Sequence, residues 1–170
     1  MTQMAEKALI LSQEQINQKI RRMAFEIWEH NFKEKEIMLA GIEGQGFILA
    51  QQIGNILEEI STLKIRLIKV SLDKLAPTQS EISVDGDPAD FKNKTIILVD
   101  DVLNTGRTIA YSMKVFLQVK IKKLEVAVLV NRSHSQFPVS ANYTGYELST
   151  TINDHVEVVL KPNKGEVYLK

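Results

Sequence analysis

Apolar residues along the chain form two kinds of pattern, and the two patterns alternate. Continuous apolar runs, typical of strands buried on both faces, occur at 37–40 and 95–99, and the largely apolar stretches 65–70 and 124–130 also predict strands. Apolar residues at helical spacing, typical of amphipathic helices, occur at 16–27, 48–60 and 109–117. Strands are also predicted near both ends of the chain, at 7–11, 156–160 and 166–169. The sequence therefore predicts an α/β protein with a mainly parallel central sheet flanked by helices.

One of the predicted strands leads directly into the residues of a candidate binding site. Asp100 and Asp101 stand where the apolar run 95–99 would end, and ligands of open α/β sheets bind beyond such strand ends. The turn that follows is rich in small residues and precedes a helix, so its backbone N–H groups can converge on an anion. The turn contains Asn104, Thr105, Gly106, Arg107 and Thr108.

The two kinds of group in this segment suit different parts of one ligand. Carboxylates repel a phosphate, whereas they accept hydrogen bonds from sugar hydroxyls or coordinate a hydrated Mg²⁺. The hydroxyls of Thr105 and Thr108 add donors to those of the backbone. A phosphate site beside a diol site describes a ribose 5-phosphate. An acidic pair alone is also compatible with a helix cap or a solvated strand end, so the assignment depends on the whole segment.

The run from 99 to 108 resembles the phosphoribosyl pyrophosphate (PRPP) motif of type I phosphoribosyltransferases. A wider resemblance is to the PyrR family, whose members regulate pyrimidine operons and often have uracil phosphoribosyltransferase activity. The stretches that carry it are 7–11, 39–42, 127–134 and 137–139, which follow the family's order along nearly the whole chain. The resemblance implies the type I phosphoribosyltransferase fold as a single domain over residues 1–170, with a small hood formed by the chain ends.

The resemblance also implies a role for each residue of the motif. Residues 105–108 would hold the 5-phosphate, and Asp100 and Asp101 would hold the ribose hydroxyls directly or through Mg²⁺, the implied cofactor. Arg132 would bind pyrophosphate oxygens through its forked donors, so Asp100, Asp101 and Arg132 form the predicted catalytic set. Asn104 stands where purine-specific enzymes with this motif commonly have Asp. An amide cannot take up a proton as that carboxylate can, which favours a pyrimidine base.

A glycine loop after the strand at 37–40 is the second predicted substrate-binding segment. It has neither the Walker A nor the Rossmann spacing, and in the resembling family this position binds the pyrophosphate of PRPP. The loop consists of Gly41, Ile42, Glu43, Gly44, Gln45 and Gly46. Family members usually carry basic residues here, and a carboxylate beside pyrophosphate is unfavourable unless Mg²⁺ intervenes or the carboxylate points away. Glu43 and Gln45 therefore predict reduced activity.

The segment 71–94 shows little periodicity, and two interpretations of it remain open. Segments of this length inside a compact domain are usually functional or mobile, and in type I phosphoribosyltransferases the corresponding loop closes over the active site. Lys74 is the cation near its start and completes the predicted substrate-binding residues. A β-hairpin with a loose tip is the alternative.

Composition narrows the class of protein. The chain has 170 residues, of which 44% are hydrophobic and 25% charged, as is ordinary for one globular domain. Its 21 basic and 21 acidic side chains cancel, so no overall field attracts it to nucleic acid or membrane. It has no cysteine and therefore neither disulfides nor thiolate zinc sites. The first residues lack the apolar core of a signal peptide and no apolar run is long enough to span a membrane, which together predict a cytoplasmic location.

Two functions are therefore predicted. The first is an enzyme that transfers phosphoribosyl from PRPP to a pyrimidine base, with uracil the foremost candidate, and releases pyrophosphate. The second is a regulator that senses PRPP or a nucleotide in the same pocket and binds RNA, with weak or no catalysis. Lys19, Arg21 and Arg22 in the first helix are then either a solvated surface or part of an RNA-binding patch. The resemblance also implies a homodimer or a higher homo-oligomer.

Overall fold

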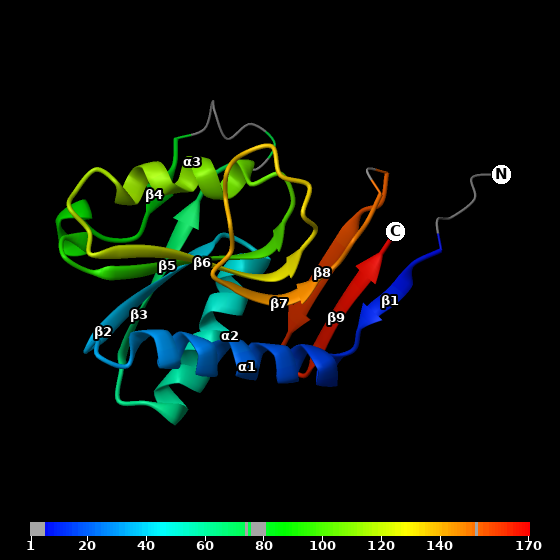
Figure 1. Ribbon diagram of the computed structural model, residues 1–170, viewed down its shortest axis with the longest axis horizontal. Coiled ribbons are helices and arrows are strands. Elements are labelled where there is room, and N and C mark those ends of the chain that lie inside the picture. The colour runs from blue at the N-terminus through cyan, green and yellow to red at the C-terminus, as the bar shows by residue number, and fades with distance from the viewer. Residues whose placement is uncertain (1–5, 74, 76–80, 152) are drawn as a thin grey trace.

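The chain folds into a central sheet with helices on both faces and a small second sheet at one side (Figure 1). The computed structural model describes residues 6–73, 75, 81–151 and 153–170. In spatial order, the central sheet consists of β4 (Ser83–Val84), β3 (Lys64–Ser71), β2 (Glu36–Ile42), β5 (Thr95–Leu103), β6 (Lys123–Asn131) and β7 (Tyr143–Glu147). Neighbouring strands are parallel, except that β4 runs antiparallel to β3. The predicted α/β fold with a mainly parallel sheet is confirmed.

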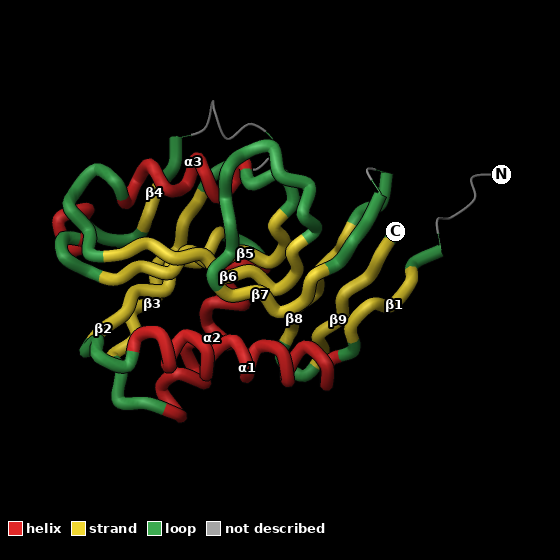
Figure 2. The backbone as a smooth tube through the Cα atoms, viewed as in Figure 1, coloured by secondary structure: helices red, strands yellow, loops and turns green. Residues whose placement is uncertain are grey.

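The helices divide the side chains of the sheet between two apolar cores. α1 (Gln13–Asn31) and α2 (Gln45–Ile60) cover one face, whereas α3 (Arg107–Phe116) and the 3₁₀ helix η1 (Pro88–Phe91) cover the other (Figure 2). In β5, Ile97 and Val99 lie in the core with α1 and α2, whereas Ile96 and Leu98 lie in the core with α3. Both faces of β5 are thus buried, which explains its continuous apolar run.

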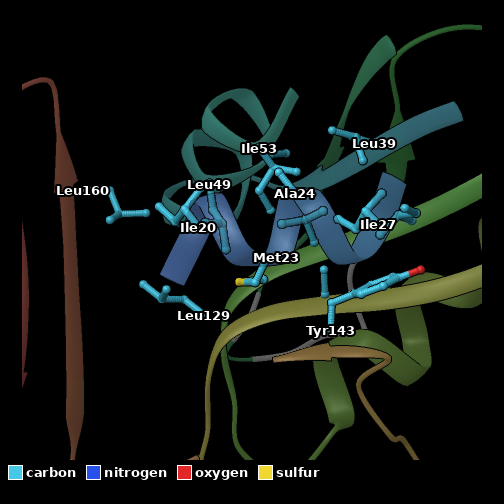
Figure 3. Close-up of a cluster of buried hydrophobic side chains, with 14 of the residues drawn as sticks. Ile20, Met23, Ala24, Ile27, Leu39, Leu49, Ile53, Leu129, Tyr143 and Leu160 are labelled. Carbon is cyan, nitrogen blue, oxygen red and sulfur yellow. The ribbon is translucent and has the colours of Figure 1, made fainter. Parts of the chain in front are cut away.

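One face of α1 forms the centre of the larger core (Figure 3). Its buried apolar residues repeat at helical spacing and are Ile16, Ile20, Met23, Ala24 and Ile27. The helix begins at a capping box, in which the Ser12 side chain accepts from the Gln15 backbone N–H and the Gln15 side chain accepts from the Ser12 N–H. The predicted amphipathic helix over 16–27 is confirmed.

The two ends of the chain meet in a three-stranded antiparallel sheet, which we call the hood. Its spatial order is β1 (Ala8–Leu11), β9 (Lys164–Leu169) and β8 (Val156–Lys161), so that the first strand pairs with the last. A turn through Pro162 and Asn163 joins β8 to β9, and Asn163 adopts the left-handed backbone that such a turn requires, with φ 61°. The predicted hood formed by the chain ends is confirmed.

Two elements differ from the pattern read along the chain. Within 71–94, β4 pairs with the end of β3 and η1 follows, so a short antiparallel pair exists there; residues 74 and 76–80 lie outside the described residues. β7 was not predicted because it is an edge strand with alternating burial and a glycine at its centre, and such a strand shows no continuous apolar run. Within the described ranges, none of the helices is long and apolar enough to cross a membrane.

Candidate active site

A cleft of about 550 Å³ lies at the carboxyl end of β5, between the β5–α3 turn and the hood. One wall consists of residues 100–109, which run from the acidic pair through the turn into α3. The other wall consists of residues 155–158 at the start of β8, and Leu75 contributes from the segment after β3. The acidic pair and the small-residue turn therefore line one cleft, as the sequence predicted.

The two acids differ in burial. Asp100 is 2% exposed, and its Oδ1 accepts a hydrogen bond of 2.9 Å from the backbone N–H of Asp101. Gly46, in the first turn of α2, approaches Asp100 so closely that a Cβ at this glycine would lie 3.0 Å from Asp100 Oδ1. Asp101 is partly exposed in the cleft. Asp101 is therefore the more accessible carboxylate, whereas Asp100 lies between β5 and α2.

The turn after the acids is held in shape by backbone contacts. Gly106 has φ 87°, a left-handed conformation, and a Cβ there would lie 3.2 Å from Val139 Cβ. The Thr105 carbonyl accepts hydrogen bonds from the N–H groups of Gln136 and Phe137, at 2.9 and 3.0 Å. The Thr105 hydroxyl accepts from the Arg107 N–H at 3.2 Å. Residues 136–139 thus support the turn from behind, a role that the sequence pattern did not reveal.

The start of α3 offers backbone donors to an anion. The first N–H groups of a helix have no intrahelical partner, and the helix dipole gives this end a partial positive charge. The cap residue Gly106 has no side chain to occupy those donors. The guanidinium of Arg107 lies over the Phe137 ring, 5.5 Å from its centroid, and Phe137 in turn makes an edge contact with Tyr111. Thr108 lines the cleft beside these groups.

The glycine loop lies beside the acidic pair but outside the cleft lining. Gly41 and Ile42 are the buried end of β2, and the N–H of exposed Glu43 donates to the Val70 carbonyl at 2.8 Å. Gly44 caps α2 with φ 94° and provides no side-chain hydrogen bond. Gln45 is turned toward the hood, where its Oε1 accepts from the Leu160 N–H at 2.6 Å.

Arg132 is buried, 7% exposed, and makes a network with the segment before β8. Its Nε donates to the Thr150 hydroxyl at 3.0 Å, and one terminal nitrogen donates to the Thr151 and Asp154 carbonyls at 3.2 and 2.5 Å. The other terminal nitrogen donates to Asn104 Oδ1 at 2.9 Å. Arg132 is not among the residues that line the cleft. The structure therefore gives this guanidinium protein partners, and its predicted contact with pyrophosphate stays a prediction.

The hood wall carries an ion-pair cluster that the sequence pattern did not reveal. The carboxylate of Glu157 lies 2.9 Å from the ammonium groups of both Lys7 and Lys170, which come from opposite ends of the chain. Hydrogen bonds from Lys170 and Lys7 lower the pKa of Glu157 to about 2. No local spacing connects residues 150 positions apart, so sequence reasoning had no signal for this contact.

The acidic pair fits a magnesium ion that binds together with a phosphorylated substrate. Among the described residues, no group of three or more His, Cys, Asp or Glu side chains is arranged to hold a metal. Mg²⁺ commonly keeps several waters and binds through one or two carboxylates and substrate phosphates. Asp101, accessible in the cleft, and its neighbour Asp100 supply that donor set.

The remaining predicted residues are Lys74 and the basic residues of α1. Lys74 lies outside the described residues. On α1, Arg22 donates to the Gly145 carbonyl at 2.6 Å and to Glu26 at 2.7 Å, while Arg21 lies 3.8 Å from Glu59. Both arginines thus have partners within the protein, and neither lines the cleft.

Comparisons with known proteins agree with this geometry. The chain matches the phosphoribosyl transferase domain family over residues 9–163. It is 36% identical to the bifunctional protein PyrR of Bacillus pumilus over 166 residues, which cover 92% of each chain. It is 35% identical to that of Clostridium acetobutylicum over 162 residues, 91% of each chain.

Solved structures share the fold at lower identity. A hypoxanthine-guanine phosphoribosyltransferase of Bacillus anthracis is 20% identical, with a TM-score of 0.70 over 83% of this chain and 82% of that one. A hypoxanthine phosphoribosyl transferase of Trypanosoma cruzi is 14% identical, with a TM-score of 0.78 over 96% and 91%. The family model and the PyrR relatives together place the chain in a family: it belongs to the phosphoribosyl transferases and, among them, to the PyrR group of PRPP-binding enzymes.

Proposed function

We propose that the protein transfers the phosphoribosyl group of PRPP to uracil and releases pyrophosphate. The observation that carries the proposal is that the acidic pair and the small-residue turn form one wall of a cleft and the hood forms the opposite wall. In this assignment the backbone donors and hydroxyls of residues 105–108 hold the 5-phosphate. Asp101 and Asp100 accept hydrogen bonds from the ribose hydroxyls or hold Mg²⁺, which neutralises negative charge on the pyrophosphate when bound.

The reaction needs positioning and charge stabilisation rather than a protein nucleophile. The bond between the anomeric carbon and the pyrophosphate oxygen breaks, and a bond from the base nitrogen to that carbon forms, while the nitrogen loses its proton. The transition state has positive character on the ribose ring, and carboxylates beside the ring stabilise it. The hood forms one wall of the cleft, and a wall beside the reacting ring reduces the access of water, which favours transfer over hydrolysis.

The side chain of Asn104 is suited to bind a base that presents a carbonyl oxygen. Its Oδ1 accepts from Arg132, so its side-chain N–H groups are the donors left for a ligand. A pyrimidine carbonyl accepts such a donor, and no carboxylate is present at this position to protonate or deprotonate a purine nitrogen. Arg132 acts here as a positioning residue, because it orients Asn104 and ties it to residues 150–154.

The test is PRPP-dependent consumption of a panel of bases in the presence of Mg²⁺, beginning with uracil. We expect uracil to be consumed and pyrophosphate released at a turnover below the ordinary enzyme range of about 1–1,000 per second, because Glu43 and Gln45 supply no cation to the glycine loop. Consumption of purines but not uracil would contradict the pyrimidine assignment. A turnover within the ordinary range would show that the lack of basic residues in the glycine loop does not slow the reaction.

The second candidate is a regulator that senses PRPP or a nucleotide in this cleft and binds RNA. The relatives named bifunctional protein PyrR favour a second activity beside the first. Retention of RNA by the protein, falling steeply with salt and changing with PRPP, would support it. Under either function we propose a single domain over residues 1–170, a cytoplasmic location and a homodimer or higher homo-oligomer, to be checked by sedimentation velocity.

A further inference from the structure

Gln45 makes a hydrogen bond that crosses the molecule from the glycine loop to the hood. Its Oε1 accepts from the backbone N–H of Leu160 at 2.6 Å, although the two residues are 115 positions apart. β8 is an edge strand, with β9 on one side only, so an N–H that points outward from it has no strand partner. Leu160 is 2% exposed, and water is therefore a poor alternative partner. The Gln45 side chain satisfies this buried donor.

The next residue ties the same loop to the acidic pair. Gly46 packs against β5 with room for no further atom: a Cβ would lie 2.9 Å from the Val99 carbonyl oxygen and 3.0 Å from Asp100 Oδ1. Two consecutive residues at the start of α2 thus contact the two strands, β8 and β5, that carry the walls of the cleft. Gln45 holds β8, whose first residues line one wall of the cleft, and Gly46 holds the strand end from which the other wall begins.

We infer that Gln45 is a positioning residue that joins the glycine loop to the hood and thereby sets the separation of the two cleft walls. The inference rests on the proposed function only for its kinetic consequence. When PRPP binds against the acidic pair and the glycine loop, the hood would already lie at the distance from the β5–α3 wall that admits a base. Gln45 acts through β8 and does not itself contact the base.

The hydrogen bond is tested by amide exchange in the protein without ligand. In Gln45→Ala and Gln45→Lys, we expect the Leu160 amide to exchange at least about tenfold faster than in the wild type, with little change at the paired strands β1 and β9. In Gln45→Glu the acceptor is kept at the same length, and Leu160 should stay protected. Gln51→Ala is the matched control, because this exposed glutamine is on the same helix. Equal exchange at Leu160 in all variants would overturn the inference, whatever the enzyme does.

The kinetic consequence separates a positioning role from a purely structural one. We expect Gln45→Ala and Gln45→Lys to raise the KM of the base about fivefold or more, with a smaller change in the KM of PRPP. A Gln45→Lys variant that binds PRPP more tightly and leaves the KM of the base unchanged would overturn the inference. It would show instead that the glycine loop only lacks a positive charge. If the wild type neither binds PRPP nor consumes a base, the proposed function fails, while the exchange result at Leu160 still decides the hydrogen bond.

Discussion

The two walls of the cleft are built in different ways. The β5–α3 wall is one continuous segment, residues 100–109, whose chemical groups are neighbours in the sequence. The hood wall is placed by contacts between distant residues, such as Gln45 with Leu160 and Lys7 with Glu157, 115 and 150 positions apart. The chemical groups of the candidate site are therefore encoded locally, whereas the distance across the cleft depends on long-range packing. Substitutions in the two walls should therefore differ in their effects on ligand affinity and on stability.

The largest effect on PRPP binding is expected in the β5–α3 wall, from Asp101→Asn. Loss of the charge that we propose to hold Mg²⁺ and the ribose should weaken Mg-PRPP binding about 100-fold, which corresponds to about 2.7 kcal/mol. Isothermal titration calorimetry with PRPP and Mg²⁺ measures this directly. Asp90→Asn is the control, since Asp90 pairs with Arg66 on the surface at 3.1 Å. An unchanged PRPP titration in Asp101→Asn would remove the basis for the proposed site.

The second effect concerns Arg132, which connects the two walls through Asn104 and Asp154. Arg132→Met leaves the carbonyls and the amide oxygen that it serves without a donor, and we expect unfolding in urea to become easier by about 2–4 kcal/mol. The KM of the base should rise more than that of PRPP, because Asn104 loses its orientation. Arg66→Met, at an exposed pair, is the control. The opposite result, intact stability with a large loss of PRPP affinity, would support the contact with pyrophosphate predicted from the sequence.

The sequence predicted the elements of the first wall because each depends on nearby residues. A strand buried on both faces needs a continuous apolar run, and the turn after it needs small residues, with Gly106 in a left-handed conformation. Both signals are local. The α/β class and the parallel sheet followed from the same kind of local signal, whereas the hood from the chain ends was implied by the family resemblance.

The second wall was less accessible to sequence reasoning. Gln45 was predicted to contact substrate because it lies in the glycine loop, but its side chain reaches an edge-strand N–H that no local pattern identifies. Arg132 directly follows β6, a strand that the sequence predicted, but its partners Thr150, Thr151 and Asp154 come from a segment without regular periodicity. A side-chain direction set by a distant hydrogen-bond partner cannot be seen in composition and spacing.

Two glycines of the glycine loop differ in what a side chain would meet there. Gly46→Ala places a Cβ against the Val99 carbonyl and Asp100, and such overpacking should cost about 1–3 kcal/mol of stability. Because Asp100 must move, PRPP affinity should fall as well. Gly44→Ala meets open space but a φ of 94°, and should cost about 1–3 kcal/mol with a smaller loss of PRPP affinity than Gly46→Ala, because no contact with Asp100 is disturbed. Urea unfolding and calorimetry on both variants separate the two effects. Equal PRPP affinity in both would show that the loop and the acid are not mechanically joined.

The smallest effect is a pH dependence confined to the hood wall. Two lysines lower the pKa of Glu157 to about 2 from its usual 4.5, so this carboxylate stabilises the folded state above about pH 4.5. That contribution is lost as pH falls from 4.5 toward 2, because the unfolded chain takes up the proton first. In Glu157→Gln we therefore expect a lower urea midpoint than in the wild type at pH 7, and a difference that shrinks as pH falls through this window. Glu14→Gln, at an exposed position of α1, is the control. A difference that stays constant between pH 7 and pH 3 would mean that Glu157 stabilises the hood by packing rather than by its charge.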